Sequence, residues 1–210
     1  MDSGFRCRSL TEPAEIAAAK RLQGRAYVRQ GHLPAEGLTR DGFLPWHDDP
    51  PADRVTWFGV FGAGGDLVAT GRMITGDRLP ALLGRPGGPG VVEPAGLAKE
   101  PGAPPVATLL IVRAFYRDSL RRGDRRWVMT VAPALRTTLC RVVPGAITID
   151  PRPVAMREQF PDVRPEAYAY PASGEVAGFV PGIRSFAASV GGDDAYRRFL
   201  YGVADFLEAE

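Results

Sequence analysis

The sequence has few of the residues that build metal sites, disulfide frameworks or membrane spans. Only two of its 210 residues are cysteine and two are histidine. Cys7 and Cys140 stand too far apart to suggest a disulfide framework or a metal site, and two histidines are too few for a structural zinc cluster. No segment approaches membrane-spanning length and the N-terminus has no long apolar run, which excludes a signal peptide and favours a soluble cytoplasmic protein.

A strong charge of either sign is also lacking. The formal net charge of +2 at pH 7 argues against a nucleic-acid binder driven by bulk electrostatics. Lys20 and Lys99 are the only lysines, so nearly all positive charge is arginine. The length allows a substantial core. We expect one domain, with residues 1–150 as its body and residues 151–210 as an extension packed on it.

The first half of the chain is predicted to form a strand, a helix and a hairpin. Weak alternation predicts a strand over 5–10, and Thr11 is a good N-cap for a helix that ends near residue 31. Gln23 falls among the apolar residues at helical spacing in that helix. Residues 31–51 form a long, apolar-rich loop rather than a linker. Two β-rich runs, 55–61 and 67–74, are joined by a glycine-rich turn and give the clearest hairpin.

The second half alternates strands and helices. The expected elements are a strand over 91–98, a helix over 106–122 ended by Gly123, a strand over 126–131, a helix over 133–143, strands over 146–150 and 175–180, and an amphipathic helix after Asp193. An antiparallel start that leads into strand–helix–strand crossovers predicts a mixed α/β fold with helices on both faces of the sheet.

The loop 99–105 between the strand at 91–98 and the long helix can bind a phosphate. A helix N-terminus presents unpaired backbone N–H groups and a partial positive charge to an anion. Pro104 and Pro105 suit the entry of a helix, because a first-turn proline lacks a donor that had no helical partner anyway. The alternative is an ordinary strand-to-helix crossover that binds nothing.

The order of elements, with Arg72 ending the hairpin and Glu93 on the next strand, resembles the GNAT acyltransferase fold. The resemblance covers roughly residues 5–150. It is greatest to the branch of N-acyl amino acid synthases and acyl-homoserine lactone (autoinducer) synthases, which also carry an acidic, aromatic-bearing loop comparable with residues 46–49. It implies a mostly antiparallel sheet whose fourth and fifth strands part into a V-shaped cleft, where the acyl-pantetheine thioester lies.

The sequence departs from this family's pattern at three places. Many relatives have an arginine three residues after the strand glutamate, where this chain has Gly96. Residues 99–104 match the family's pyrophosphate-binding loop pattern only in part, and Pro104 removes a backbone donor that a diphosphate would use. The general-acid tyrosine of many relatives is missing from residues 133–143.

Glu93 and Arg72 are the candidate catalytic residues. An acid in an apolar strand has a raised pKa, which suits a base that accepts a proton from an ammonium group near neutral pH. Arg72 can hold a substrate carboxylate through its planar fork. A structural ion pair is the alternative role for both. The resemblance adds candidates for binding the acyl donor and the acceptor: Leu97, Ala98, Lys99, Gly102 and Ala103 for the donor, Trp46 and Asp49 for the acceptor.

Other polar residues are given structural roles. His47 is expected at the surface, and Cys140 is expected to be a small buried hydrophobe. Three arginines at helical spacing form a stripe that can dock an acidic acyl carrier protein, or can simply be solvated: Arg113, Arg117 and Arg121.

The leading hypothesis is therefore an N-acyltransferase. It would move an acyl group from acyl-CoA or an acyl-phosphopantetheine carrier to the amine of an amino acid or a related small molecule, without a metal. Phe199 and Phe206 of the last helix line an acyl tunnel or belong to ordinary core packing. The alternatives are acetyl transfer from acetyl-CoA to a small molecule, and a catalytically degenerate fold that serves as a binding or scaffold protein.

Overall fold

The computed structural model describes residues 4–48, 50–76, 79, 81, 83–85, 87–158 and 160–209. Within these residues the strands are β1 Arg6–Leu10, β2 Val55–Phe61, β3 Leu67–Thr75, β4 Val91–Lys99, β5 Arg126–Val131, β6 Thr148–Ile149, β7 Val154–Ala155 and β8 Tyr168–Glu175. The α-helices are α1 Pro13–Arg29, α3 Pro105–Arg122, α4 Pro133–Val142, α5 Phe179–Ser189 and α6 Asp194–Glu208. The described residues also include the short 3-10 helices η1 Ala35–Gly37, η2 Ala52–Arg54 and η3 Met156–Glu158.

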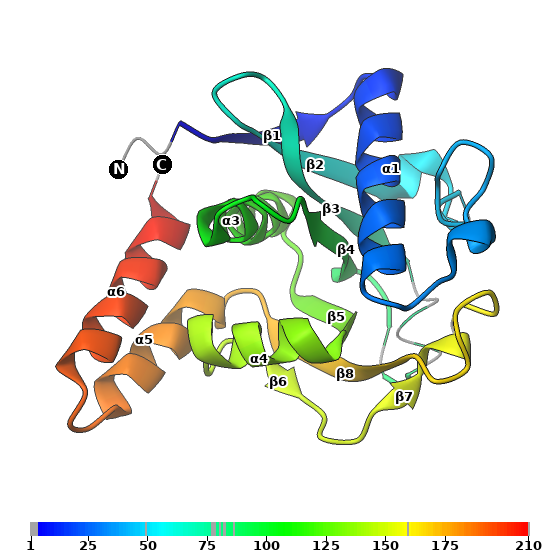
Figure 1. Ribbon diagram of the computed structural model, residues 1–210. Coiled ribbons are helices and arrows are strands. Elements are labelled where there is room, and N and C mark those ends of the chain that lie inside the picture. The colour runs from blue at the N-terminus through cyan, green and yellow to red at the C-terminus, as the bar shows by residue number, and fades with distance from the viewer. Residues whose placement is uncertain are drawn as a thin grey trace.

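One sheet runs through the protein in the order β1-β2-β3-β4-β5-β8-β6, and β7 pairs with β8. Of these pairs only β4 and β5 are parallel. Helix α1 lies on one side of the sheet and α3 on the other (Figure 1). The predicted mixed, mostly antiparallel sheet with helices on both faces is therefore confirmed.

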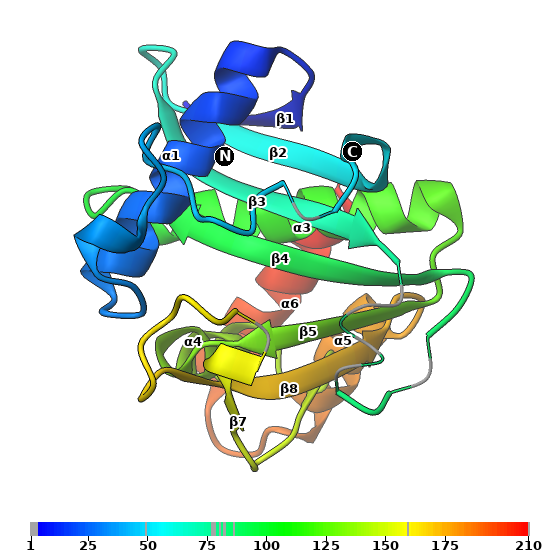
Figure 2. The ribbon, with the colours of Figure 1, turned by 90° about the vertical axis from the view of Figure 1, so that its right-hand side faces the viewer.

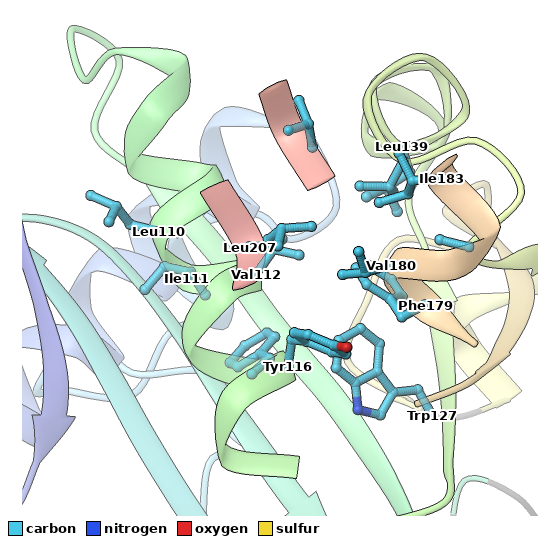
Figure 3. Packing of buried hydrophobic residues seen from close by; sticks show 14 of the residues in the cluster. Leu110, Ile111, Val112, Tyr116, Trp127, Leu139, Phe179, Val180, Ile183 and Leu207 are labelled. Atoms are coloured by element: carbon cyan, nitrogen blue, oxygen red, sulfur yellow. The ribbon is translucent and has the colours of Figure 1, made fainter. Parts of the chain in front are cut away.

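The largest hydrophobic cluster lies between the sheet and helices α3, α5 and α6. Figure 3 shows Ile111 of α3, Phe179 of α5 and Leu207 of α6 in this cluster, and all three side chains are fully buried or nearly so. Helix α3 can approach β3 closely because Gly71 faces it, where an added Cβ would lie 2.5 Å from the Phe115 ring. This packing holds α3 directly behind the middle of the sheet.

Several predicted helix ends are confirmed and one is wrong. Helix α3 ends at Gly123 in the left-handed conformation, with φ 72°, and the Asp193 carboxylate accepts the Tyr196 N–H at 2.8 Å to cap α6. Thr11 does not cap α1. The N-cap is Glu12, without a side-chain hydrogen bond, because Pro13 already fixes a helical φ at the first position.

The C-terminal third contains the main errors of the sequence analysis. Residues 175–180 are not a strand: Glu175 ends β8, and α5 begins at Phe179. Pro181 made a helix look unfavourable from the sequence. It lies in the first turn of α5, where a proline removes no hydrogen bond within the helix. The strand predicted over 146–150 is limited to Thr148–Ile149.

Strand β8 lies between β5 and β6, so residues 168–175 belong to the same sheet as the hairpin. The division of the chain at residue 150 stays a prediction. None of the described helices has both the length and the apolar character that crossing a bilayer requires.

Candidate active site

The strands β4 and β5 part soon after they begin. Their pairing covers Val91 with Arg126 and Val92 with Trp127, although β4 continues to Lys99 and β5 to Val131. Figure 2 shows the two strands diverging, with α6 visible behind the gap. The splayed strand pair expected from the sequence is therefore present.

A cavity of about 580 Å³ opens where the strands part. From β4 it is lined by residues 96–99, from β5 by Thr130, and from the α1 side of the sheet by Tyr27, Met156 and Ala169. It therefore reaches both faces of the sheet. Its volume lies in the range of small-molecule sites.

On the opposite face the cavity runs between α3 and α4. From each helix, four lining residues are spaced i, i+3, i+4 and i+7: Pro105, Thr108, Leu109 and Val112 of α3, and Leu135, Thr138, Leu139 and Val142 of α4, where Ala134 lines the cavity as well. Residues at this spacing share one face of a helix, and seven residues of helix span about 10 Å. This part of the cavity is thus a mostly apolar channel about two helical turns long.

Glu93 and Arg72 lie on the same face of the sheet. Arg72 is directly opposite Ala95, and Glu93 is directly opposite Ile74. The two residues are therefore diagonal neighbours on adjacent strands, a spacing within reach of long side chains. This face is the one covered by α1, because the Arg72 guanidinium lies 5.3 Å above the Trp57 ring and Nη1 donates to the His47 carbonyl at 3.1 Å.

The pKa of Tyr27 is affected by the charges of both Arg72 and Glu93. Burial raises the pKa of Tyr27 above its ordinary value, while the Arg72 charge lowers it and the Glu93 charge raises it. The tyrosine also lines the cavity. A carboxyl group, a guanidinium and a phenol thus lie on the α1 side of the gap.

Trp46 lies in a second, smaller hydrophobic cluster on this side. Its ring stacks on Phe160, with centroids 4.4 Å apart, and meets Tyr27 edge-on at 5.8 Å. The loop around Trp46 and the segment around Phe160 therefore pack together over the α1 face. Asp49, the other predicted acceptor residue, lies outside the described residues.

His47 is buried, with 2% of its surface exposed, so its predicted surface position is wrong. Its Nδ1 accepts the Leu44 N–H at 3.1 Å, and its Nε2 lies 2.8 Å from Gln23 Oε1. Burial, with smaller effects of Arg72 and Lys20, lowers the pKa of His47 to about 2. The ring is therefore neutral, and the loop on which it lies is held against α1.

The predicted donor-binding residues divide into two groups. Leu97, Ala98 and Lys99 line the cavity. Gly102 and Ala103 are not among the lining residues, although the Ala103 carbonyl accepts a hydrogen bond from Lys99 Nζ at 2.6 Å.

The loop that joins β4 to α3 offers few backbone donors. Two of its positions, Pro101 and Pro104, are proline, and α3 begins with a third proline, Pro105. The N–H of Glu100 donates to Val68 and that of Ala103 to Glu100. A diphosphate would thus find little of the backbone cradle that this kind of loop provides.

The arginine stripe on α3 has contacts within the protein. Arg113 and Arg117 both donate to the Ala209 carbonyl after α6, and Arg113 also lies over the Phe206 ring. Arg121 pairs with Asp118 and keeps 78% of its side chain exposed. Phe206 therefore belongs to the packing of α6 on α3, whereas Phe199 lines the cavity.

Cys140 is exposed, which corrects its predicted burial. The buried side of α4 is formed by Leu139, and the next residue along a helix points elsewhere. The residues that the sequence analysis missed are Gln23 and Tyr27. A glutamine within the apolar spacing of α1 was the available signal for the first of them.

Comparison with known proteins adds to this geometry. No protein-family model matches the sequence, and no curated protein matches it. Among solved structures, FeeM, an N-acyl amino acid synthase from uncultured soil microbes, aligns with a TM-score of 0.62 and 17% identity over 85% of this chain and 94% of its own. BjaI, a CoA-dependent acyl-homoserine lactone synthase, aligns with a TM-score of 0.66 and 14% identity over 97% and 90%. TofI aligns with a TM-score of 0.61 and 17% identity over 85% and 95%.

The chain thus has the GNAT-like fold that the sequence predicts. Its structural neighbours include N-acyl amino acid and acyl-homoserine lactone synthases, the branch to which the sequence resemblance pointed. At these identities the likeness is one of fold.

Proposed function

We propose that the protein is an N-acyltransferase that moves an acyl group from a pantetheine thioester to the amine of an amino acid or a related small molecule. The observation that carries the proposal is a cavity that reaches both faces of the sheet where β4 and β5 part. A thioester placed in this gap has room for its acyl chain and its arm on the α3 side. The acceptor then approaches from the α1 side.

The acceptor side supplies a base and a cation. In the proposed step, Glu93 removes one proton from the substrate ammonium, directly or through a water molecule. The amine nitrogen attacks the thioester carbonyl carbon and the C–S bond breaks. The second amine proton goes to the sulfur of the departing thiol. Arg72 holds the carboxylate of the acceptor, which a planar guanidinium binds through two hydrogen bonds.

The channel between α3 and α4 favours a long acyl group over acetyl. Leu109, Leu135 and Leu139 give it an apolar wall, and each buried methylene contributes about 0.8 kcal/mol. An acetyl group would leave that surface uncovered. The α4 end of the channel is bordered by Val142 and by Phe199 of α6, so we assign the acyl tail to this end.

The poor supply of backbone donors in the β4–α3 loop favours a donor held by a carrier protein over free coenzyme A. The cations at this end of the cavity are Arg29, which donates to the Lys99 carbonyl at 2.9 Å, and Lys99 itself. They fit the one phosphate of a carrier-borne arm. Of the three stripe arginines, Arg121 is the most available to an acidic carrier surface.

Turnover of acyl thioesters with amino acid acceptors tests the proposal. We expect activity that rises with chain length from acetyl to long acyl groups, and loss of turnover in Glu93→Gln with folding intact. Activity with acetyl-CoA alone would favour the acetyltransferase alternative. Absence of turnover with every thioester, on CoA and on carrier, would leave a binding or scaffold role.

Charge reversal distinguishes the two donors. Arg121→Glu is expected to raise KM for an acyl carrier protein and to leave KM for the matching acyl-CoA unchanged. Equal effects on both donors would remove the stripe from carrier docking.

A further inference from the structure

Gln23 is a fully buried amide between the two sides of the site. It lies on the inner face of α1 with 0% of its surface exposed. Its Oε1 lies 2.8 Å from His47 Nε2, and its Nε2 donates to the Gly96 carbonyl at 2.6 Å. Its two polar ends therefore connect the loop that carries His47 to β4, which lines the cavity at Gly96.

The direction of each hydrogen bond in this set is determined. His47 Nδ1 accepts from the Leu44 backbone N–H, so the proton of the neutral ring is on Nε2. Nε2–H then donates to Gln23 Oε1, which leaves the amide NH2 group to face Gly96. The orientation of the Gln23 side chain is thus fixed from the His47 side.

The Gly96 carbonyl belongs to an irregular part of β4. Thr70 pairs with Ala98 and Arg72 pairs with Ala95, so Gly96 and Leu97 together oppose Gly71 in a β-bulge. Gly96 has φ +60°. Because a trans peptide points its C=O and N–H in opposite directions, a carbonyl held by Gln23 turns the Leu97 N–H away from α1.

We propose that Gln23 is a positioning residue, which sets the Gly96–Leu97 peptide so that the Leu97 N–H meets the thioester carbonyl oxygen in the strand gap. Gly96 and Leu97 line the cavity and Gln23 does not. The direction away from Gln23 is therefore toward the α3 side, where the cavity continues. This role rests on the proposed acyl transfer, in which negative charge develops on that oxygen.

Two variants separate the hydrogen bond to Gly96 from the packing of the side chain. Gln23→Met keeps the length and apolar contacts of the side chain and removes both hydrogen bonds. Gln23→Glu keeps an acceptor for His47. Burial raises the pKa of the introduced carboxyl, whose protonated form can still donate to Gly96, so this variant removes the donor only at a pH high enough to ionise the carboxyl. We expect kcat to fall about tenfold or more in Gln23→Met and, at such a pH, in Gln23→Glu, with KM for the donor little changed, because the interaction acts on the transition state.

A buried hydrogen bond elsewhere in the core provides the control. Ser119 is fully buried, accepts from Trp127 Nε1 at 2.8 Å and is not among the cavity lining. Ser119→Ala should lower the melting temperature and leave kcat unchanged. Nitrogen NMR of His47 should show the Nε2–H tautomer in the wild type and in Gln23→Glu, and a changed Nε2–H resonance in Gln23→Met.

The outcomes identify which claim fails. If the wild type turns over acyl thioesters and both Gln23 variants keep its kcat, the positioning role is overturned and the acyl transfer stands. If kcat falls in Gln23→Met but not in Gln23→Glu at a pH that ionises the introduced carboxyl, the residue acts through His47 and the proposal about Gly96 is wrong. If the wild type turns over no thioester, the proposed function fails and this role fails with it.

Discussion

The substitution Gly96→Ala should destabilise the protein for two separable reasons. A non-glycine residue in the left-handed region costs about 1–2 kcal/mol. The new Cβ would also lie 2.3 Å from Gln23 Nε2, a distance at which the amide must move. Leaving buried donors and acceptors without partners costs a further ~1–3 kcal/mol.

The sum predicts a loss of about 2–5 kcal/mol in the free energy of unfolding. For a chain of this size each kcal/mol corresponds to about 2–4 °C in the melting temperature. Gly65→Ala is the matched control, because Gly65 has φ +83° and no neighbour within 4 Å of an added Cβ. It should show the strain alone, about 1–2 kcal/mol.

Calorimetry of the single variants and of Gly96→Ala combined with Gln23→Ala completes the test. Truncation of Gln23 removes the atoms that the new Cβ would meet, so Gly96→Ala should cost less in that background. If Gly96→Ala were no worse than Gly65→Ala, or if the double variant showed simple additivity, the close approach of Gln23 to β4 would be refuted.

Three further predictions concern the cavity and its surroundings. Phe199→Ala should shift the preferred acyl chain toward longer donors, with affinity rising up to about fourfold for each added methylene. Tyr201→Ala on the same helix should not change the preference. A thermal-shift series with acyl donors of increasing length measures both effects. Because the pKa of His47 is about 2 in the folded protein against an ordinary 6.5, the unfolded state binds the proton first, so stability should fall by up to ~1.4 kcal/mol per pH unit as the pH drops below 6.5. Urea titrations at several pH values give the free energy of unfolding at each pH, and this free energy should fall less steeply with decreasing pH in His47→Asn. Arg72→Lys should raise KM for a carboxylate-bearing acceptor about tenfold because the planar fork is lost, and an equal effect on an amine without a carboxylate would contradict that role.

The fold was largely predictable because its main elements carry local signals. The hairpin has a glycine-rich turn between two β-branched runs, and α3 has a long apolar period that ends at Gly123. The strand β8 was missed because Pro171 and small residues hide its alternation, and its stability comes from pairing with β5 on one side and β6 on the other. Such long-range pairing leaves little trace in a local window.

The candidate site was predictable only in part, for a related reason. Arg72 and Glu93 were found because each occupies a defined place on a recognisable strand, and their shared face follows from the register of β3 and β4. Tyr27 and Gln23 lie within an ordinary helical stripe of α1. Their significance depends on what packs against that stripe. Gln23 bonds to His47, which is 24 positions away in the chain, and to Gly96, which is 73 positions away.

Gly96 shows how a single position can change meaning once its neighbours are known. In the sequence it is the place where an arginine of many relatives is missing, which weakens the case for catalysis. In the folded protein Gly96 adopts a left-handed φ within 2.6 Å of a buried amide, and any side chain there would displace Gln23. The glycine and the glutamine therefore form one structural unit. In this chain a side chain at position 96 would force Gln23 or the β4 backbone to move. The glycine is therefore required by the local packing, and the absence of the arginine is not by itself evidence of a degenerate site.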